Sequence, residues 1–309
     1  MAEPVVAKAL RVSGVPAELA GLAAALGIVR LAPLNGGVEF LVFRGTGPDG
    51  EDLVVRMPRA RTFHTANNVG VEALLLLDQE QRLAEWLAPQ GFPVAEVLGR
   101  HQTGTGLPVL ISRFVASDDG DPDWASVGAL LATLHDLPAP EPCPVLQYGM
   151  SLPELIAKRL PERFRRLQAL QPDLGGLPSP AAIARRLAAV PARHALLHLD
   201  VRRQNLLCRG GLVRAVIDWS NALVGDPRME LARMSEYARI PENGLDEALI
   251  RKGYAASLSE EGVADCFYRL DAAVMLALVF LSVAPRPDLA PAQTARVTEL
   301  LTTLGAGWH

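Results

Sequence analysis

Residues 198–218 bring together side chains that could transfer a phosphoryl group. In this segment Asp200 and Asn205 are five positions apart, and Asp218 follows Asn205 by thirteen. An aspartate and an amide oxygen are ligands that suit Mg²⁺, which keeps several waters and bridges phosphates. Asp200 remains as a carboxylate that could orient and deprotonate an acceptor hydroxyl. Phosphoryl transfer needs these two things, a metal that neutralises charge and a positioned base.

The local sequence around these residues predicts a hairpin. Strand-like patterns over 205–208 and 212–217 flank the turn residues 209–211, which include two glycines. Asn205 begins the first strand and Asp218 follows the second. A short hairpin would bring both ends together, so we expect Asn205 and Asp218 to lie close to one another.

The segment from His198 to Leu207 resembles the H-x-D-x-x-x-x-N catalytic loop of the aminoglycoside phosphotransferase family. That family includes macrolide phosphotransferases and relatives of choline and homoserine kinases, and it is distantly related to protein kinases. The triplet 217–219, Ile-Asp-Trp, and the stretch 224–227, Val-Gly-Asp-Pro, fit the same family. The family usually has His-Gly-Asp, whereas this chain has Leu199 at the glycine position. The resemblance covers most of the chain and is strongest in residues 196–232.

The resemblance implies a role for each residue of the motif. Asp200 is expected to be the catalytic base, and His198 is expected to brace the loop by hydrogen bonding. Asn205 and Asp218 are expected to hold Mg²⁺ at the phosphates of ATP or GTP. Two acidic residues are expected to stabilise the segment after the metal ligand: Asp226 and Glu230.

The family pattern places a lysine on the third strand, where it contacts phosphate and pairs with a glutamate on a helix. The chain has 30 basic residues, of which only Lys8, Lys158 and Lys252 are lysines, and none of them lies on a predicted strand. The strand 53–57 offers Arg56 instead. Arginine keeps the charge and adds a bidentate fork. We therefore expect Arg56 to bind phosphate and to pair with Glu80, with Glu72 as the alternative partner.

Two more segments stand where the family contacts nucleotide. Gly36 and Gly37 lie in the loop 33–38, in the place of the loop that covers the phosphates, and glycine would let the backbone approach them. The segment 111–115, with Arg113 and Val115, takes the hinge position. Its backbone is expected to hydrogen-bond the purine.

The hydrophobic pattern predicts the elements that position these residues. Residues 1–30 and 71–87 show helical spacing, whereas strand patterns cover 38–44, 52–57, 94–98 and 107–115. After the loop 117–122, helical patterns dominate; they cover 124–135, 152–170, 180–190 and most of the chain from residue 227.

Strands near the N-terminus followed by helices predict an α+β protein. With the resemblance, we expect a bilobal, protein-kinase-like fold with a small, mostly antiparallel β N-lobe and a larger, mainly helical C-lobe. The expected domains are residues 1–115, which bind nucleotide, and 116–309, which carry the catalytic loop and bind the acceptor.

Composition limits the classes of protein to consider. The chain has 309 residues, half of them hydrophobic, and a formal net charge of −4, which argues against a nucleic-acid partner. Three scattered cysteines show no zinc or disulfide spacing. The N-terminal residues lack the pattern of a secretory signal, and the apolar run 272–284 is too short to span a membrane. We therefore expect a cytoplasmic protein with no membrane partner, either a monomer or a homodimer.

These features predict a nucleotide-dependent kinase that phosphorylates a hydroxyl of an antibiotic or related natural product. Helical residues 150–200 are rich in arginine, which disfavours a polycationic aminoglycoside and favours a macrolide, a nucleoside or another less charged acceptor. The acidic residues that could still bind a cation are Glu230, Glu236, Glu242 and Asp246.

Three alternatives remain open. A metabolite kinase could act on an amino alcohol or a sugar. A nucleotide-binding pseudokinase would fit the departures at Arg56 and Leu199. A zinc hydrolase could use His194 and His198, which are four positions apart, although no glutamate stands beside His194 to act as a base.

Overall fold

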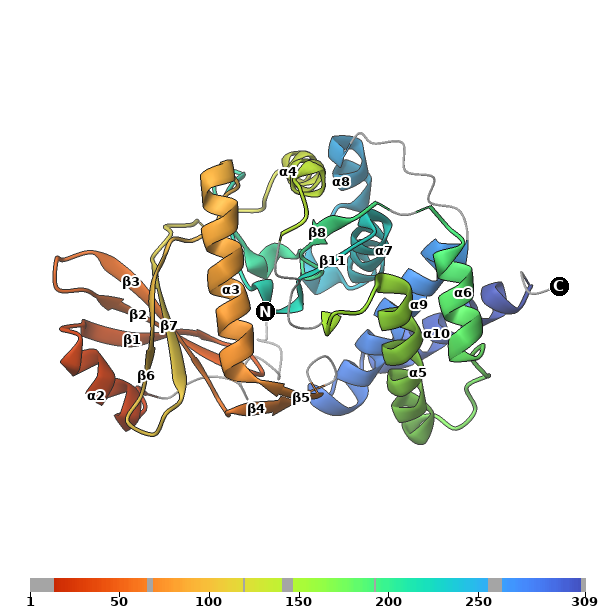
Figure 1. Ribbon diagram of the computed structural model, residues 1–309, viewed down its shortest axis with the longest axis horizontal. Helices are drawn as coiled ribbons and strands as arrows, with labels where there is room; N and C mark the ends of the chain where they lie inside the picture. The colour runs from red at the N-terminus through yellow and green to blue at the C-terminus, as the bar shows by residue number, and fades with distance from the viewer. Residues whose placement is uncertain are drawn as a thin grey trace. The chain divides into compact units, whose positions relative to one another are not determined.

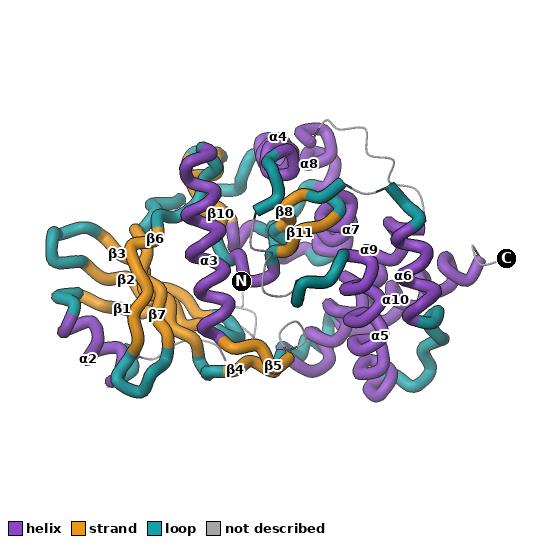
Figure 2. Tube along the Cα trace, in the orientation of Figure 1, coloured by secondary structure: helices purple, strands orange, loops and turns teal. Residues whose placement is uncertain are grey.

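The computed structural model describes residues 14–65, 69–118, 120–140, 147–191, 193–254 and 263–306, without the side chains of residues 35, 263 and 306 (Figures 1 and 2). Contacts divide the chain into two compact units. The first unit comprises Met1–Asp119, Leu207–Arg209 and Arg214–Ser220. The second comprises Gly120–Leu206, Gly210–Val213 and Asn221–His309.

The first unit is built on a five-stranded sheet with the strand order β1-β2-β3-β7-β6, in which all neighbours are antiparallel. Helix α3, Ala73–Leu87, contacts β6 and β7 of this sheet (Figure 1). The remaining elements are α2 and the paired strands β4 and β5. The bounds are α2 Ala17–Ala25, β1 Val29–Gly36, β2 Phe40–Thr46, β3 Asp52–Pro58, β4 Thr62–His64, β5 Val69–Glu72, β6 Val97–Gln102 and β7 Pro108–Arg113.

Side-chain alternation along β3 determines where Arg56 points. Val55 and Met57 are 1% and 2% exposed and belong to the hydrophobic core that also contains Leu19 of α2. Successive side chains of a strand point to opposite faces of the sheet. Arg56, between these two residues, therefore points to the other face of the sheet and contacts Glu80 of α3.

The predicted strands and the helix of the first unit are present, with shifted ends. The helical prediction for residues 1–30 is wrong at its end, because β1 begins at Val29; residues 1–13 lie outside the described part. The alternation of β1 is interrupted by Pro33 and by two register shifts against β2, which obscures its period. The pair β4 and β5 was not predicted, since each strand has only three or four residues.

The second unit is mainly helical, and α9 packs against α5, α6, α7 and α10 (Figure 2). A short strand pair, β8 and β11, precedes α7. Strands β9 and β10, most of whose residues belong to the first unit, form the predicted hairpin as a separate two-stranded sheet. The bounds are α4 Trp124–Asp136, α5 Leu152–Leu170, α6 Pro180–Ala188, β8 Ala195–Leu197, β9 Leu206–Arg209, β10 Leu212–Val216, β11 Leu223–Gly225, α7 Pro227–Ala238, α8 Glu247–Tyr254, α9 Val263–Leu278 and α10 Ala290–Ala306.

Two glycines allow α4 and α8 to cross with their backbones in contact. A Cβ atom on Gly128 would lie 2.0 Å from the Ile250 oxygen, and one on Gly253 would lie 1.8 Å from the Ala125 oxygen. Any larger residue at either position would force the helices apart.

The predicted helix 152–170 matches α5 at both ends. At its N-terminus, Ser151 and Glu154 form a capping box. The apolar run 272–284 continues α9 into a π-helical turn, Val279–Val283. The helical segment Ala264–Val283 is long and apolar enough to cross a membrane, but 61% of its most apolar window is buried inside the structure. The buried side chains of this segment include Leu270, Val274, Leu276 and Leu278.

Candidate active site

The main chain of the catalytic loop is held by one buried carboxylate. The loop joins the end of β8 to the start of β9. Glu230, in the first turn of α7, accepts the backbone N–H of His198 at 2.6 Å and that of Leu199 at 2.8 Å. Leu199 itself has a φ of +60°, the left-handed conformation that its side chain disfavours.

Glu230 is ionised despite being completely buried. Burial alone would raise the pKa of this carboxyl, but His135 and the His198 backbone N–H outweigh burial and hold the pKa below its usual value. The nearest His135 nitrogen lies 3.8 Å from Glu230. The loop is therefore bound by a charged acceptor, which forms stronger hydrogen bonds than a neutral one.

His198 is fully buried, and its Nδ1 accepts the backbone N–H of Asp200 at 3.2 Å. This contact is the kind of bracing that the sequence suggested for His198. His194, its partner in the zinc alternative, is exposed just before β8. Among the described residues, no group of three or more His, Cys, Asp and Glu side chains could hold a metal ion by itself.

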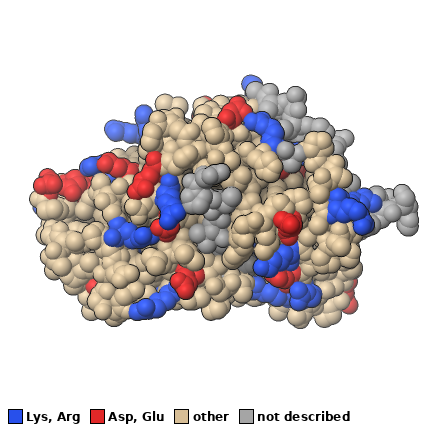
Figure 3. All heavy atoms as spheres, in the orientation of Figure 1, with Lys and Arg blue, Asp and Glu red and all other residues tan. Residues whose placement is uncertain are grey.

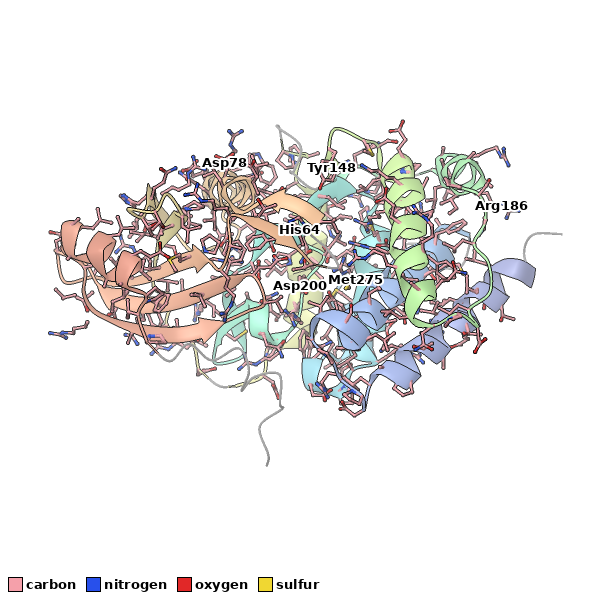
Figure 4. The ribbon with its side chains drawn as sticks, turned by 90° about the horizontal axis from the view of Figure 1, so that it is seen from below. His64, Asp78, Tyr148, Arg186, Asp200 and Met275 are labelled. Atoms are coloured by element: carbon pink, nitrogen blue, oxygen red, sulfur yellow. The ribbon has the colours of Figure 1, made fainter. Side chains whose placement is uncertain are left out.

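Both carboxylate oxygens of Asp200, labelled in Figure 4, accept hydrogen bonds within the second unit. Oδ2 accepts from the Asn205 amide nitrogen at 2.8 Å, and Oδ1 accepts from the Tyr237 hydroxyl at 3.1 Å. The Arg202 Nε lies 3.2 Å from Oδ1. Asp200 is 6% exposed, so these contacts define its orientation.

Sequence reasoning did not find Tyr237 or Arg233, and it placed Glu230 against a different segment. The three residues occupy positions i, i+3 and i+7 of α7, which lie on one face of a helix. The sequence signal that could have identified them is the presence of polar residues at this spacing on a helix that follows the catalytic motif. They were missed because their partners, His198 to Asp200, are 31 to 37 positions away.

The amide of Asn205 is oriented with its nitrogen toward Asp200. Its Nδ2 also donates to the Asp200 backbone oxygen at 2.8 Å. An amide that uses its nitrogen in this way presents its carbonyl oxygen elsewhere, and oxygen is the atom that a hard cation binds. The chemistry of Asn205 therefore fits the predicted metal ligand.

In the first unit, Arg56 lies between two carboxylates. It donates to Glu80 of α3 and, at 2.7 Å, to Asp218 Oδ1 after β10. Its guanidinium also lies 4.2 Å from the ring centroid of Phe40. The predicted pairing with Glu80 is thus present, whereas Glu72 is exposed at the end of β5.

The charges of this group are unequal, since one cation faces two anions. Burial raises the pKa of Glu80, Arg56 lowers it and Asp218 raises it again, so that it lies above its usual value. Burial would lower the pKa of Arg56, but Asp218 and Glu80 raise it. With both carboxylates ionised, the group would carry an excess of one negative charge, which would favour a divalent cation.

The backbone around Asp218 is anchored to α3 and to the hairpin. Asp218 has a φ of +66°, and its Oδ1 also accepts the Ser220 hydroxyl at 2.7 Å. Gln79 donates to the Trp219 oxygen at 2.8 Å, and the Trp219 ring packs edge-on against Phe92. Trp219 is 2% exposed and is therefore a packing residue.

The other predicted nucleotide residues have structural contacts of their own. Gly36 pairs with Leu41 in the sheet, and the Gly37 N–H donates to the Phe40 oxygen at 2.9 Å to close the turn. This hydrogen bond would have to break before the Gly37 N–H could contact phosphate.

At the end of β7, Arg113 pairs with Glu96 through both its backbone N–H and its guanidinium, each at 2.8 Å. The Phe114 N–H donates to the Asp52 oxygen at 2.9 Å. Val115 follows and is half-buried. The N–H groups of Arg113 and Phe114 are thus already used, so Val115 is the better candidate for a contact with the purine.

These residues and their arrangement were compared with known proteins. The model of the phosphotransferase enzyme family, APH, matches residues 30–263. The chain belongs to this family. No match was found among curated proteins. The family assignment confirms that the chain is a nucleotide-dependent phosphotransferase with an alcohol group as acceptor.

Solved structures with the same fold include three kinds of kinase. A thermostable mutant of aminoglycoside phosphotransferase APH(4)-Ia gives a TM-score of 0.61 at 18% identity, with 93% of this chain and 98% of that chain covered. Macrolide 2'-phosphotransferase MphH from Brachybacterium faecium gives 0.54 at 20% identity, over 90% and 95%. Choline kinase LicA from Streptococcus pneumoniae gives 0.57 at 13% identity, over 93% and 97%. The expected bilobal, kinase-like α+β fold is confirmed.

The positive φ of Leu199 predicts that its glycine variant is more stable than its alanine variant, which is the reverse of the usual order. Leu199→Ala loses a buried side chain, at a cost of about 2–5 kcal/mol, and keeps the disfavoured conformation. Leu199→Gly loses the same contacts but relieves about 1 kcal/mol of backbone strain. The glycine variant should therefore be the more stable of the two in urea unfolding.

Val201 supplies the matched control, because it is 2% exposed in the same loop and does not have a positive φ. There the glycine variant should be less stable than the alanine variant by about 0.5–1 kcal/mol. An identical order at both positions would contradict the conformational argument.

Arg56→Met should weaken nucleotide use, because it removes the cation that would contact phosphate and leaves Glu80 facing Asp218. We expect the nucleotide KM to rise by about tenfold or more, measured by steady-state kinetics. Arg100→Ala is the control, since Arg100 of β6 pairs with Asp78 of α3 at 2.7 Å in another strand-to-helix ion pair. Unchanged KM and kcat in Arg56→Met would exclude Arg56 from the phosphate site.

Proposed function

We propose that this protein transfers the γ-phosphoryl group of ATP or GTP to a hydroxyl of an antibiotic or related natural product of low positive charge. The observation that carries the proposal is the environment of Asp200, a buried carboxylate fixed by hydrogen bonds in the family's catalytic motif. A carboxylate held in this way can orient a hydroxyl and accept its proton.

The proposed nucleotide contacts follow from the family motif and from the contacts within each unit. Asn205 and Asp218 are proposed to bind Mg²⁺, which would supply positive charge to neutralise the phosphates. The excess negative charge of the Arg56 group and the orientation of the Asn205 amide support this assignment. Arg56 would bind phosphate, and the main chain at Val115 would meet the purine. For comparison, a thermostable mutant of APH(4)-Ia was solved as a ternary complex with AMP-PNP and hygromycin B.

The acidic residues of the second unit support an acceptor of low positive charge. Four of them were candidates for binding a cation: Glu230, Glu236, Glu242 and Asp246. Glu230 holds the catalytic loop, Glu236 is buried against Arg296 at 2.8 Å, and Glu242 pairs with Arg286 at 2.5 Å. Asp246 accepts the Leu249 N–H at the start of α8. Each candidate therefore has a partner already, and a polycation would have to displace it.

The cations near Asp200 support the same conclusion. Arg202 lies beside the carboxylate with 39% of its side chain exposed, and Arg233 is buried behind Tyr237. These guanidinium groups would repel an ammonium group next to the reacting hydroxyl. Arg159 and Arg163, which contributed to the arginine count, pair with the buried Asp271 and leave the surface less basic than the sequence suggested. On the face shown in Figure 3, basic and acidic side chains are interspersed.

A mass-shift screen tests the proposal. The protein is incubated with Mg²⁺, with ATP or GTP, and with a panel of macrolides, nucleosides, aminoglycosides, amino alcohols and sugars, and the products are examined for a gain of one phosphate. We expect transfer to a neutral or weakly charged natural product. Transfer to an amino alcohol or sugar alone would support the metabolite-kinase alternative, and nucleotide binding without any transfer would support the pseudokinase alternative.

Asp200→Asn should reduce transfer by about 10²-fold or more, because it removes the base while keeping the size of the side chain. Nucleotide affinity, measured by calorimetry, should be unchanged. Asp136→Asn is the control, since Asp136 is an exposed aspartate at the end of α4 that pairs with Arg193. Full activity of Asp200→Asn would contradict the assignment of the base.

A further inference from the structure

Tyr237 has no role in the family motif, but its hydroxyl touches the proposed base. It lies near the end of α7, is 5% exposed, and places its hydroxyl 3.1 Å from Asp200 Oδ1. Its ring belongs to the same hydrophobic cluster as Met275 of α9. Tyr237 therefore contacts Asp200 through its hydroxyl and packs in the cluster of Met275 through its ring; Asp200 and Met275 are labelled in Figure 4. A side chain packed in this way has little freedom to turn.

The direction of the hydrogen bond is determined by Arg233. Its Nε lies 3.1 Å from the Tyr237 hydroxyl, and a guanidinium can only donate. The tyrosine oxygen therefore accepts from Arg233, and its single proton is directed to Asp200. Burial, partly offset by Arg233, raises the pKa of Tyr237 to about 12, so the donor keeps its proton at neutral pH.

The contacts of Asp200 are distributed unevenly over its two oxygens. Oδ1 accepts from Tyr237 and faces the Arg202 Nε at 3.2 Å, whereas Oδ2 accepts from Asn205 at 2.8 Å. Each carboxylate oxygen offers about two lone-pair positions. The Arg202 Nε is close to Oδ1 but forms no hydrogen bond with it. Among the described residues, two side chains therefore lie against Oδ1 and one lies against Oδ2, so Oδ2 is the less crowded oxygen for a further donor.

We propose that Tyr237, directed by Arg233, is a positioning residue that presents Asp200 Oδ2 to the acceptor hydroxyl. The inference rests on the proposed function. In the reaction, the acceptor oxygen forms a bond to the γ-phosphorus while the bond from that phosphorus to the oxygen of the β-phosphate breaks. The hydroxyl proton moves to Asp200 Oδ2, and the nucleoside diphosphate leaves. Tyr237 takes part in neither bond and acts only through the orientation of the carboxylate.

Tyr237→Phe keeps the packing and removes only the hydroxyl. With ATP, Mg²⁺ and an acceptor found by the mass-shift screen, we expect kcat to fall by about tenfold while the KM values of both substrates change by less than about twofold. A general loss of structure would change KM and kcat together, so this split distinguishes positioning from folding. An unchanged kcat would overturn the proposal.

Tyr268→Phe is the matched control. Tyr268 of α9 is 3% exposed, and its hydroxyl lies 3.3 Å from the buried carboxylate of Asp226, away from the catalytic loop. Both variants lose a tyrosine–aspartate contact in the same unit, so their Tm values should shift similarly. Only Tyr237→Phe should lower kcat, and an equal fall in both variants would overturn the proposal.

Crystal structures of the two variants provide a test that does not need an acceptor. In Tyr237→Phe the Asp200 carboxylate should turn about its Cβ–Cγ bond or divide between two conformers, whereas in Tyr268→Phe it should stay as it is here. An unchanged carboxylate in Tyr237→Phe would overturn the inference whatever the activity. A turned carboxylate in a protein that phosphorylates no acceptor would sustain the positioning role and overturn the proposed function.

Discussion

The carboxylate of Glu230 determines the geometry on which the catalytic loop depends. It is fully buried, and it accepts two successive backbone N–H groups of the loop. In the same loop Leu199 has the left-handed conformation, which leucine adopts only at a cost. The two charge-assisted hydrogen bonds offset that cost. Asp200 is the next residue, so its direction follows from this bond and from the contact of its N–H with His198.

Helix α7 acts as a platform for the loop because three of its polar residues share one face. Glu230 holds the main chain, Tyr237 holds the Asp200 side chain, and Arg233 directs the tyrosine. A buried charge is costly unless it is paired and hydrogen-bonded. Glu236, also on α7, meets the same requirement through Arg296. The acidic residues of the second unit thus serve its own structure, and this is why we propose an acceptor of low positive charge.

The sequence was sufficient for the residues that lie close together along the chain. Asp200 and Asn205 are linked by a loop of a few residues, and the hairpin after Asn205 has clear turn residues, so local patterns predicted both features. The pairing of Arg56 with Glu80 was also predicted, because a strand arginine and a helix glutamate stood at the family's positions. Tyr237 was not predicted, since its hydrogen bond to Asp200 depends on how α7 packs. Strand β1 was missed for a different reason, because irregular pairing obscures its alternation.

Glu230→Gln tests most directly whether the buried carboxylate organises the catalytic loop. Glutamine has nearly the same size, but one of its oxygens is replaced by an amide donor, which would face a backbone N–H. The measurement is the single-turnover rate of phosphoryl transfer with saturating nucleotide and acceptor, compared with wild type. The account predicts a fall of about 10²-fold, comparable with loss of an electrostatic contact in the transition state, with nucleotide affinity unchanged. A wild-type rate in a folded Glu230→Gln variant would contradict it.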